Sequence, residues 1–512
     1  MIDFTGISRT YFRRVFEAEI RAEESLEAGQ RRLLGELLRH SRDTRIGAMH
    51  GFGALRSYEE YASRVPVADY GLLRPLVMEM VEGKKDVLWP GRTHRFAQSS
   101  GTSDGKSKYI PITGRALSRG HYAGAAFSLA SYLHYHPDSR VFGGKNFILG
   151  GSFANELSLP TGVKVGDLSA TLIDRINPLV NLFRIPSKEI ALMERWEEKL
   201  PALVEASIRA DVRSISGVPS WFLTVLRRVL ETTGAKDIHS VWPNLEVFFH
   251  GGIAFGPYRS QYAAITDPAR MRYWENYNAS EGFFGVQAYP GKPDMRLLMN
   301  ADVFYEFIPA DDPQAAPLPA WEVKEGEIYA LLITSSNGLW RYPIGDTVMV
   351  TGTHPLTITI AGRTRCFINA FGEEVMVYNT DAALLAACRA TGAEAVDYTA
   401  APVYADGGHR GRHQWLIEFA KAPEDMEQFE EILDKALQQQ NSDYQAKRSG
   451  GIFLDRLTVV AGAPGIFNRW LASTGKLGGQ RKVPRLSNDR RIMDPILRLN
   501  AEIASPSTDK KP

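Results

Sequence analysis

A loop rich in glycine, hydroxyl groups and lysine, set between two strand-like runs, constrains this chain more than any other feature. Residues 98–108 have the sequence Gln-Ser-Ser-Gly-Thr-Ser-Asp-Gly-Lys-Ser-Lys. Glycines let the backbone approach an anion closely, and backbone N–H groups, hydroxyls and lysine can then neutralise phosphate oxygens. The segment therefore indicates a phosphate-binding loop. The alternative without a function is an ordinary polar hairpin, although a random loop seldom combines so many of these residue types.

The surroundings of the loop discriminate between three kinds of phosphate or catalytic loop. Residues 100–107 fit the Walker A pattern except that Ser100 replaces its first glycine, and residues 101–105 match the G-x-S-x-G elbow of serine hydrolases, with Ser103 as nucleophile. Both patterns need a helix directly after the loop. Residues 109–113 instead place β-branched side chains around a proline, which predicts a strand. The context favours the third kind, a loop between two strands.

Length and periodicity predict an α/β protein with more than one domain. A single hydrophobic core rarely grows beyond about 250–300 residues, and this chain has 512. Helical patterns, the first over residues 11–40, alternate with short strand-like runs. Those runs are 93–97, 146–149, 245–249, 271–274 and 327–334. The pattern of residues along the chain changes near Gly362, which predicts a large N-terminal domain of residues 1–361 and a smaller α/β domain of residues 362–512.

Charge and cysteine content narrow the possible partners and the compartment. The net charge is +1, whereas nucleic acids and anionic membranes select a clear basic excess, so we expect neither as the main partner. The chain has 2 cysteines, no apolar signal segment at its N-terminus and no apolar run of the roughly 18 residues that a membrane span needs. These features predict a cytoplasmic protein. The sequence leaves the oligomeric state open.

Three further segments carry information through their order along the chain. They are residues 277–282 (YNASEG), 338–346 (GLWRYPIGD) and 479–485 (GQRKVPR). With the loop, they resemble the auxin-responsive family of acyl acid amido synthetases, which contains the plant auxin- and jasmonate-conjugating enzymes and bacterial homologues within the adenylate-forming superfamily. The resemblance runs from about the first helix to Arg485. Plant members usually have arginine–leucine where this chain has Pro343 and Ile344, so the chain looks more like the bacterial members.

The resemblance implies a fold and a reaction. The fold is a large N-terminal adenylate-forming domain, with mixed sheets, helices and a small β-barrel-like part, and a mobile C-terminal domain that pivots near residues 362–365. The reaction uses ATP and Mg²⁺ to activate a small carboxylic acid as an acyl-adenylate, and then transfers the acyl group to an amine, for which an amino acid is the expected source. Coenzyme A is a second possible acceptor within the superfamily. A serine hydrolase that uses Ser103 and a nucleotide sensor without catalytic activity are the competing hypotheses.

The resemblance also implies roles for individual residues. Tyr277 would stack on adenine, Asp346 would accept hydrogen bonds from the ribose hydroxyls, and Glu281 is suited to Mg²⁺. Lys482 would neutralise the α-phosphate during adenylation, so Glu281 and Lys482 are the expected catalytic residues. The full set of expected ATP contacts is Ser99, Ser100, Gly101, Thr102, Ser103, Gly252, Tyr277, Ser280, Glu281, Asp346 and Arg363. Each type also has an ordinary structural use, such as an exposed Glu281 or a turn-stabilising Asp346.

The remaining candidates carry weaker signals. Tyr122, Val218 and Trp221 align with stretches that contact the acid in the family, but small and aromatic residues suit core helices equally well. Arg341 could bind phosphate or pair with an acidic neighbour. The histidine pairs 134/136 and 409/413 have no third ligand in the sequence pattern, so we do not predict a metal site there.

Overall fold

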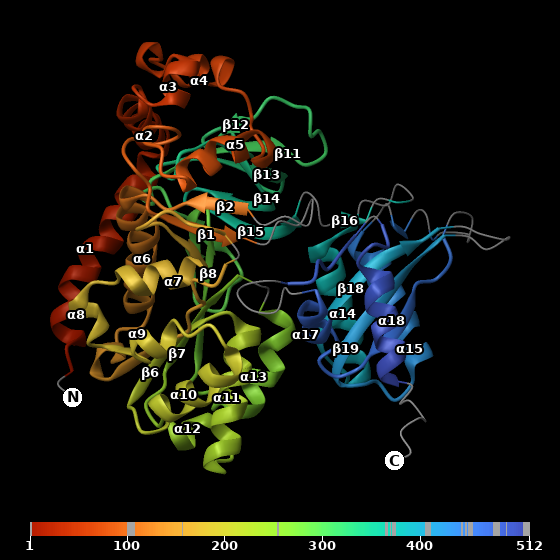
Figure 1. The fold of residues 1–512 in the computed structure, drawn as a ribbon. Coiled ribbons are helices and arrows are strands. Elements are labelled where there is room, and N and C mark those ends of the chain that lie inside the picture. The colour runs from red at the N-terminus through yellow and green to blue at the C-terminus, as the bar shows by residue number, and fades with distance from the viewer. Residues whose placement is uncertain are drawn as a thin grey trace.

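The computed structural model describes most of the chain as a large N-terminal domain and a smaller C-terminal domain (Figure 1). The described residues are 3–99, 108–155, 157–252, 255–363, 367–368, 370, 375–404, 411–441, 444–445, 448, 454–474, 482–487 and 489–504. In Figure 1 the blue C-terminal domain lies beside the N-terminal domain. The predicted α/β class and two-part organisation are confirmed, while the boundary at residue 362 stays a prediction.

The first helices of the chain pack against both the parallel and the antiparallel strands of the N-terminal domain. They are α1 (Thr5–Glu24), α2 (Leu26–Ser41), α3 (Arg45–His50), α4 (Tyr58–Arg64) and α5 (Tyr70–Val81), with a short 3₁₀ turn at Phe52–Ala54. The sequence predicts one helical region over residues 11–40, and the structure divides it at Ser25. The Ser25 hydroxyl donates to the Arg21 carbonyl at 3.1 Å. Such side-chain bonds compete with the helical backbone pattern, which accounts for the break.

The N-terminal domain contains one large sheet of 12 strands, in the order β12-β11-β13-β14-β15-β10-β9-β8-β7-β6-β3-β5. Its parallel part consists of β3 (Lys145–Ile148), β5 (Arg184–Ile185), β6 (Val212–Gly217), β7 (Val247–Gly251) and β8 (Arg272–Ala279). The antiparallel strands are β9 (Gly282–Gln287), β10 (Met295–Leu297), β11 (Val303–Pro309), β12 (Leu318–Pro319), β13 (Ile328–Ser335), β14 (Leu339–Thr353) and β15 (Leu356–Arg363). These antiparallel strands continue the parallel strands in one sheet.

Alternate residues of the parallel strands face two different helical layers. Phe248 packs in a cluster with residues of α10–α13, whereas its neighbour Val247 packs with α1 and α6. This follows from the period of two in a strand. The helices of this region are α6 (Tyr122–Tyr135), α7 (Leu168–Arg175), α8 (Pro178–Asn181), α9 (Lys188–Ala191), α10 (Trp196–Ile208), α11 (Pro219–Thr233), α12 (Ile238–Val241) and α13 (Arg259–Ile265). A π-helical turn at Ala116–His121 and 3₁₀ turns at Val141–Gly143 and Gly256–Tyr258 complete the region.

A separate sheet of 3 strands carries the glycine-rich loop. Its order is β2-β1-β4, with β1 at Arg95–Ser99, β2 at Lys108–Pro111 and β4 at Lys164–Gly166. β1 and β2 are antiparallel and enclose the loop. The predicted strand after the loop is therefore confirmed.

The C-terminal domain is a small sheet between two pairs of helices. The strands β18 (Glu394–Val403), β19 (Arg412–Lys421) and β20 (Thr458–Gly462) form the sheet. Trp415 packs in the cluster of α14 (Val377–Thr391) and α15 (Met426–Gln440), and the next residue, Leu416, packs in that of α17 (Ile466–Ser473) and α18 (Met493–Ala504). A short hairpin of β16 (Phe367–Ile368) and β17 (Val375–Met376) precedes these elements.

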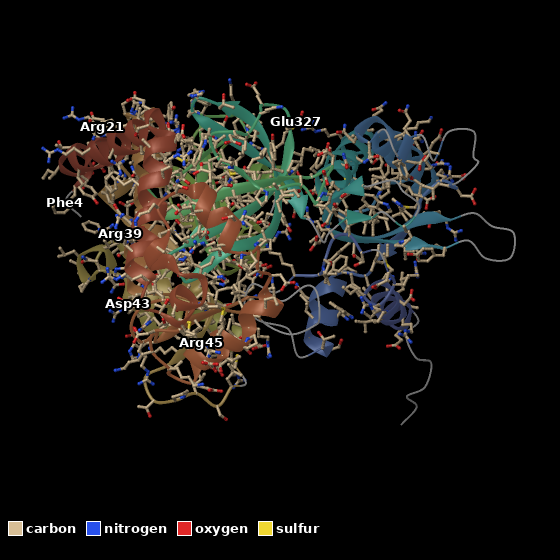
Figure 2. All side chains as sticks on the ribbon, turned by 90° about the horizontal axis from the view of Figure 1, so that it is seen from above. Phe4, Arg21, Arg39, Asp43, Arg45 and Glu327 are labelled. Carbon is tan, nitrogen blue, oxygen red and sulfur yellow. The ribbon has the colours of Figure 1, made fainter. Side chains whose placement is uncertain are left out.

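The outer surface of the N-terminal domain lies away from the second domain. Figure 2 shows the exposed residues Phe4, Arg21 and Arg39 on the side turned away from the C-terminal domain. Among the described residues, no helix is both long enough and apolar enough to cross a membrane.

Candidate functional site

Two of the expected ATP residues, Gly252 and Tyr277, lie where parallel strands of the large sheet end. β6 leads into Val218, β7 ends at Gly251 and is followed by Gly252, and β8 carries Tyr277 near its end. Because β6, β7 and β8 are parallel neighbours, their carboxyl ends meet at one edge, where open α/β sheets commonly bind ligands. A Cβ placed on Gly252 would lie 3.6 Å from Val218 Cγ2 and 3.9 Å from Lys482 Nζ. Residues from three distant parts of the chain thus share this edge.

Lys482 comes from the C-terminal domain and contacts the edge directly. Its ammonium group donates a hydrogen bond to the carbonyl oxygen of Gly252. Gly252 has φ +78°, which places it in the left-handed region that glycine adopts without strain. A second contact joins the domains, from Gln261 Nε2 to the Ala395 carbonyl at 3.4 Å. The C-terminal lysine therefore lies beside two of the residues expected to form the site.

The base of the glycine-rich loop is held by two tyrosines. Ser99 pairs with Lys108 across the β1–β2 ladder, and the Tyr70 hydroxyl accepts the N–H of Tyr109 at 2.7 Å. Lys108 Nζ donates to the Tyr342 hydroxyl at 3.2 Å. Ser100, Gly101, Thr102 and Ser103 lie outside the described residues, as does the side chain of Ser99. Since a strand and not a helix follows this loop, its context fits neither Walker A nor the hydrolase elbow.

Tyr277 and Asp346 are joined by a hydrogen bond. The Tyr277 hydroxyl donates to Asp346 Oδ2 at 2.8 Å, which links β8 to β14 across the sheet. The Tyr277 ring packs on Phe284 with 5.1 Å between ring centroids, and only 4% of the residue is exposed. In this conformation the ring offers adenine little open surface, so the stacking role expected from the sequence is not what the geometry favours. The hydrogen bond instead orients the carboxylate expected to bind ribose.

Glu281 lies in the turn between β8 and β9 and is buried. Ser280 and Glu281 are 8% and 6% exposed, and the Glu281 carbonyl accepts from Asn337 Nδ2 at 2.9 Å. This differs from an exposed strand-end glutamate, which is the ordinary structural use of this residue type. Burial raises the pKa of Tyr70 to about 12, and the negative charge of Glu281 adds to that increase. The Glu281 carboxylate is therefore near enough for its charge to act on Tyr70, the tyrosine that holds the base of the loop.

At this position the protein can supply only some of the ligands that a magnesium ion needs. Among the described residues, no group of three or more His, Cys, Asp or Glu side chains could hold a metal. Mg²⁺ in nucleotide sites is usually bound by one or two carboxylates together with substrate phosphates and water. A single buried carboxylate near the base of the expected phosphate loop matches that donor set, so Glu281 is the residue that fits.

Arg363, the last expected ATP residue of the N-terminal region, lies at the end of β15. Its backbone pairs with that of Asp346 across the β14–β15 ladder. Its side chain lies outside the described residues, and so do residues 364 and 365 of the expected pivot. A Cβ on Gly362 would meet the Val377 nitrogen at 3.4 Å, so the first helix of the C-terminal domain begins close to this strand.

Of the expected acyl contacts, Val218 lies at the same edge, beside Gly252. Val218 immediately precedes α11, whose first residue is Pro219, and the half-buried Trp221 packs against the cluster of that helical layer. The Tyr122 hydroxyl donates to the Leu172 carbonyl at 2.8 Å, which ties α6 to α7. Burial raises the pKa of Tyr122 to about 12, so its hydroxyl keeps its proton.

Arg341 pairs with an acidic neighbour and has a structural role. Its Nη2 lies 2.8 Å from Glu306 Oε1, and its Nη1 donates to the carbonyls of Ala62 and Val65 at 2.8 and 2.9 Å. Arg341 is 4% exposed. The two arginine interpretations left open by the sequence are thus resolved in favour of the ion pair.

Sequence reasoning missed the two tyrosines that hold the loop. Tyr342 lies within the 338–346 segment, beside Arg341, so the sequence motif could have identified it as a site candidate. Tyr70 lies on α5 with no motif around it, and only the tertiary structure brings it to Tyr109. Of the discounted histidine pairs, His134 stacks on Phe16 with 4.0 Å between ring centroids, which is a packing role, and His409 lies outside the described residues.

Three family models match this chain and together span most of it. The GH3 family N-terminal domain matches residues 20–271, the central domain residues 296–363 and the C-terminal domain residues 378–491. The solved structure of GH3.15 acyl acid amido synthetase has a TM-score of 0.76 at 16% identity, covering 93% of this chain and 94% of that one. A 2-hydroxyisobutyryl-CoA ligase in its postadenylation state has a TM-score of 0.57 at 13% identity, covering 95% and 92%. These likenesses show the fold of adenylate-forming enzymes.

Relatives with similar sequences are plant enzymes. The chain is 24% identical over 399 residues to the indole-3-acetic acid-amido synthetase GH3.8 of Oryza sativa subsp. indica, covering 64% of this chain and 65% of the relative. It is 36% identical over 87 residues to the jasmonoyl–L-amino acid synthetase JAR4 of Nicotiana attenuata, covering 15% of each. The chain thus matches just under two thirds of the length of its first plant relatives. From the three matched family domains and the shared fold, the chain belongs to the GH3 family.

Proposed function

We propose that this protein is an ATP-dependent ligase that converts a small carboxylic acid into an acyl-adenylate and transfers the acyl group to the amine of an amino acid. The observation that carries the proposal is the contact of Lys482 with the Gly252 carbonyl, because it brings a cation of the C-terminal domain to the edge where Gly252 and Val218 lie. Membership of the GH3 family and the named activities of its plant members support the same reaction.

The first step needs positioning and charge neutralisation more than a protein nucleophile. A carboxylate oxygen of the acid attacks the α-phosphorus of ATP, and the bond to pyrophosphate breaks. Asp346, oriented by Tyr277, would accept hydrogen bonds from the ribose hydroxyls. The loop that begins at Ser99 would hold the phosphates, and Lys482 would offset the charge of the two reacting anions. Mg²⁺, held by Glu281, would supply further neutralisation of the phosphates when bound.

The second step forms the amide. A neutral amine attacks the acyl carbon, the bond from that carbon to the AMP oxygen breaks, and the nitrogen releases a proton. Water must be kept from the reactive anhydride meanwhile. A C-terminal domain that changes pose after adenylation would open the space now taken by Lys482, and such lid motions commonly serve two-step enzymes.

The structure weakens the hydrolase hypothesis and leaves the acceptor to experiment. A serine hydrolase needs a helix after Ser103, where β2 follows. We expect purified enzyme, ATP, Mg²⁺ and a suitable acid to give an amide by mass spectrometry when amino acids are supplied. Coenzyme A in place of the amino acids is the matched arm. A thioester without any amide would make the protein an acyl-CoA ligase, and a covalent acyl-Ser103 would make it a hydrolase.

A further inference from the structure

The segment that carries Lys482 is fixed to the C-terminal domain by its own backbone. The Arg485 carbonyl accepts the N–H of Ala400 at 2.7 Å, and the Ala400 carbonyl accepts the N–H of Ser487 at 3.1 Å. Thr399 Oγ1 donates to the Pro484 carbonyl at 2.7 Å. Residues 482–487 thus extend alongside β18.

Arg485 adds a side-chain anchor three residues after Lys482. Its Nη1 lies 2.6 and 2.7 Å from the two carboxylate oxygens of Asp381, and its Nε lies 3.8 Å from Asp397 Oδ1. The guanidinium also lies over the Tyr398 ring, 5.1 Å from its centroid, and the Tyr398 hydroxyl donates to Asp381 at 2.7 Å. We call Asp381, Asp397, Tyr398 and Arg485 the arginine clamp. It is largely enclosed, since the Arg485 side chain is 15% exposed.

The clamp joins the first helix of the C-terminal domain to the segment that carries Lys482. Asp381 lies on α14, the helix that begins at Val377 beside Gly362, whereas Arg485 lies between α17 and α18. Burial raises the pKa of Asp397, and the positive charges of Arg485 and Lys482 both act against that increase. The charges of Arg485 in the clamp and of the Lys482 ammonium therefore both act on Asp397.

A lysine on a mobile segment is a poor catalytic cation, because ordering the backbone that carries it costs conformational entropy in addition to that of its side chain. Arg485 removes part of this problem by fixing the backbone that carries Lys482. We propose that Arg485 is a positioning residue for adenylation, which holds the Lys482 segment against β18 and α14 so that the ammonium reaches the Gly252 edge. The role assigned to Lys482 rests on the proposed function.

The decisive test is a double-mutant cycle with the two half-reactions measured separately. Arg485→Gln should slow acid-dependent pyrophosphate exchange about 10- to 100-fold, the range expected for the loss of hydrogen bonds to a charged group. It should change acyl transfer from preformed acyl-adenylate much less. In a Lys482→Ala background, Arg485→Gln should cause no further loss of exchange, because the group that it positions is already absent. Arg485→Lys, which keeps the charge, should restore part of the rate.

The matched control is Arg490→Gln. Arg490 is another half-buried arginine of this domain, and it donates to the Pro402 carbonyl and to Gln414 at 3.1 and 2.7 Å. It should leave the ratio of the two half-reactions unchanged. Losses that add in the double variant, or equal losses in both half-reactions with Arg485→Gln, would show a merely structural role and overturn the proposal.

A readout without turnover separates this inference from the proposed function. Lys482 is exposed, but in the wild type its hydrogen bond to the Gly252 carbonyl should slow its acetylation by acetic anhydride, followed by mass spectrometry. Arg485→Gln should raise the labelling rate of Lys482, and Arg490→Gln should not. If labelling rises but no acid supports exchange in the wild type, the positioning role stands and the proposed function fails. If labelling is unchanged while the wild type is active, the positioning role fails alone.

Discussion

The hydroxyl of Tyr277 donates a 2.8 Å hydrogen bond to the carboxylate of Asp346, across 69 residues of sequence. One residue lies near the end of a parallel strand and the other lies on an antiparallel strand, so the bond connects the two halves of the large sheet. A carboxylate held in one orientation can present its second oxygen to a ligand without reorganising. The pair therefore provides a simple test of the ATP site.

Removing the hydroxyl or the carboxylate should have effects of different size. Tyr277→Phe keeps the ring against Phe284 and deletes one bond to a charged acceptor, worth about 1.5–3 kcal/mol. It should raise KM for ATP about 10- to 100-fold. Asp346→Ala should lose most activity. Steady-state kinetics with ATP varied measure both, and a Tyr277→Phe enzyme with unchanged KM would show that the tyrosine does not orient a ribose ligand.

The alanine variants of Glu281 and Ser103 should also lose activity to different extents. The comparison distinguishes a ligase from a hydrolase, which would need Ser103 as its nucleophile. Ser103→Ala removes one of several expected phosphate donors and should retain measurable exchange, with a loss of about 1–3 kcal/mol. Glu281→Ala removes the buried carboxylate that fits Mg²⁺ and should abolish most activity. Exchange assays at several magnesium concentrations test this. Complete loss in Ser103→Ala, with an acyl-serine trapped in the wild type, would contradict the ligase assignment.

Local patterns predicted the strands and the phosphate-loop context, because β-branched runs and turn residues act over a few neighbours. The strand after the loop, predicted from residues 109–113, is β2 at Lys108–Pro111. The partners of Tyr277 and Arg341 could not be predicted, because Asp346 and Glu306 reach them through strand pairings distant in sequence. Similarly, the type of residue at 277 suggested stacking on adenine, while the packing of the ring on Phe284 could not be predicted from local sequence.

The proposed pivot at residues 362–365 predicts unequal effects on the two half-reactions. Thr364→Pro should stiffen this segment, since proline fixes φ and removes a donor. If the protein folds, one half-reaction should slow more than the other. Lys482→Ala should slow adenylation more than transfer from preformed acyl-adenylate. Rapid-quench measurements of each step distinguish these outcomes, and equal losses in both steps would remove the support for a pivot here and for a catalytic Lys482.

Stability should depend on pH through Glu19, a buried carboxylate that anchors α1. Burial raises the pKa of Glu19 to about 7, although the N–H groups of Met299 and Asn300 donate to it. Between the unfolded pKa near 4.3 and this value the folded state binds the extra proton, so the free energy of unfolding falls as pH rises, in total by on the order of 3 kcal/mol.

Glu19→Gln cannot titrate and should lose this part of the pH dependence. Urea unfolding at pH 5 and pH 8 should show a smaller difference for the variant than for the wild type. Glu17→Gln is the matched control, because Glu17 lies on the same helix with a side chain that is 51% exposed. An identical pH dependence in wild type and Glu19→Gln would mean that Glu19 does not titrate in this range.

The most direct test of the central claim is the exchange of labelled pyrophosphate into ATP across a panel of carboxylic acids, without an acceptor. Formation of an acyl-adenylate is reversible and requires the acid, so we expect exchange with at least one acid, none without acid, and strong loss in Asp346→Ala. ATP binding by calorimetry serves as the control for a folded nucleotide site. Exchange with an effective acid would establish adenylation, whereas ATP binding with no exchange for any acid would contradict it and identify a nucleotide-binding protein without ligase activity.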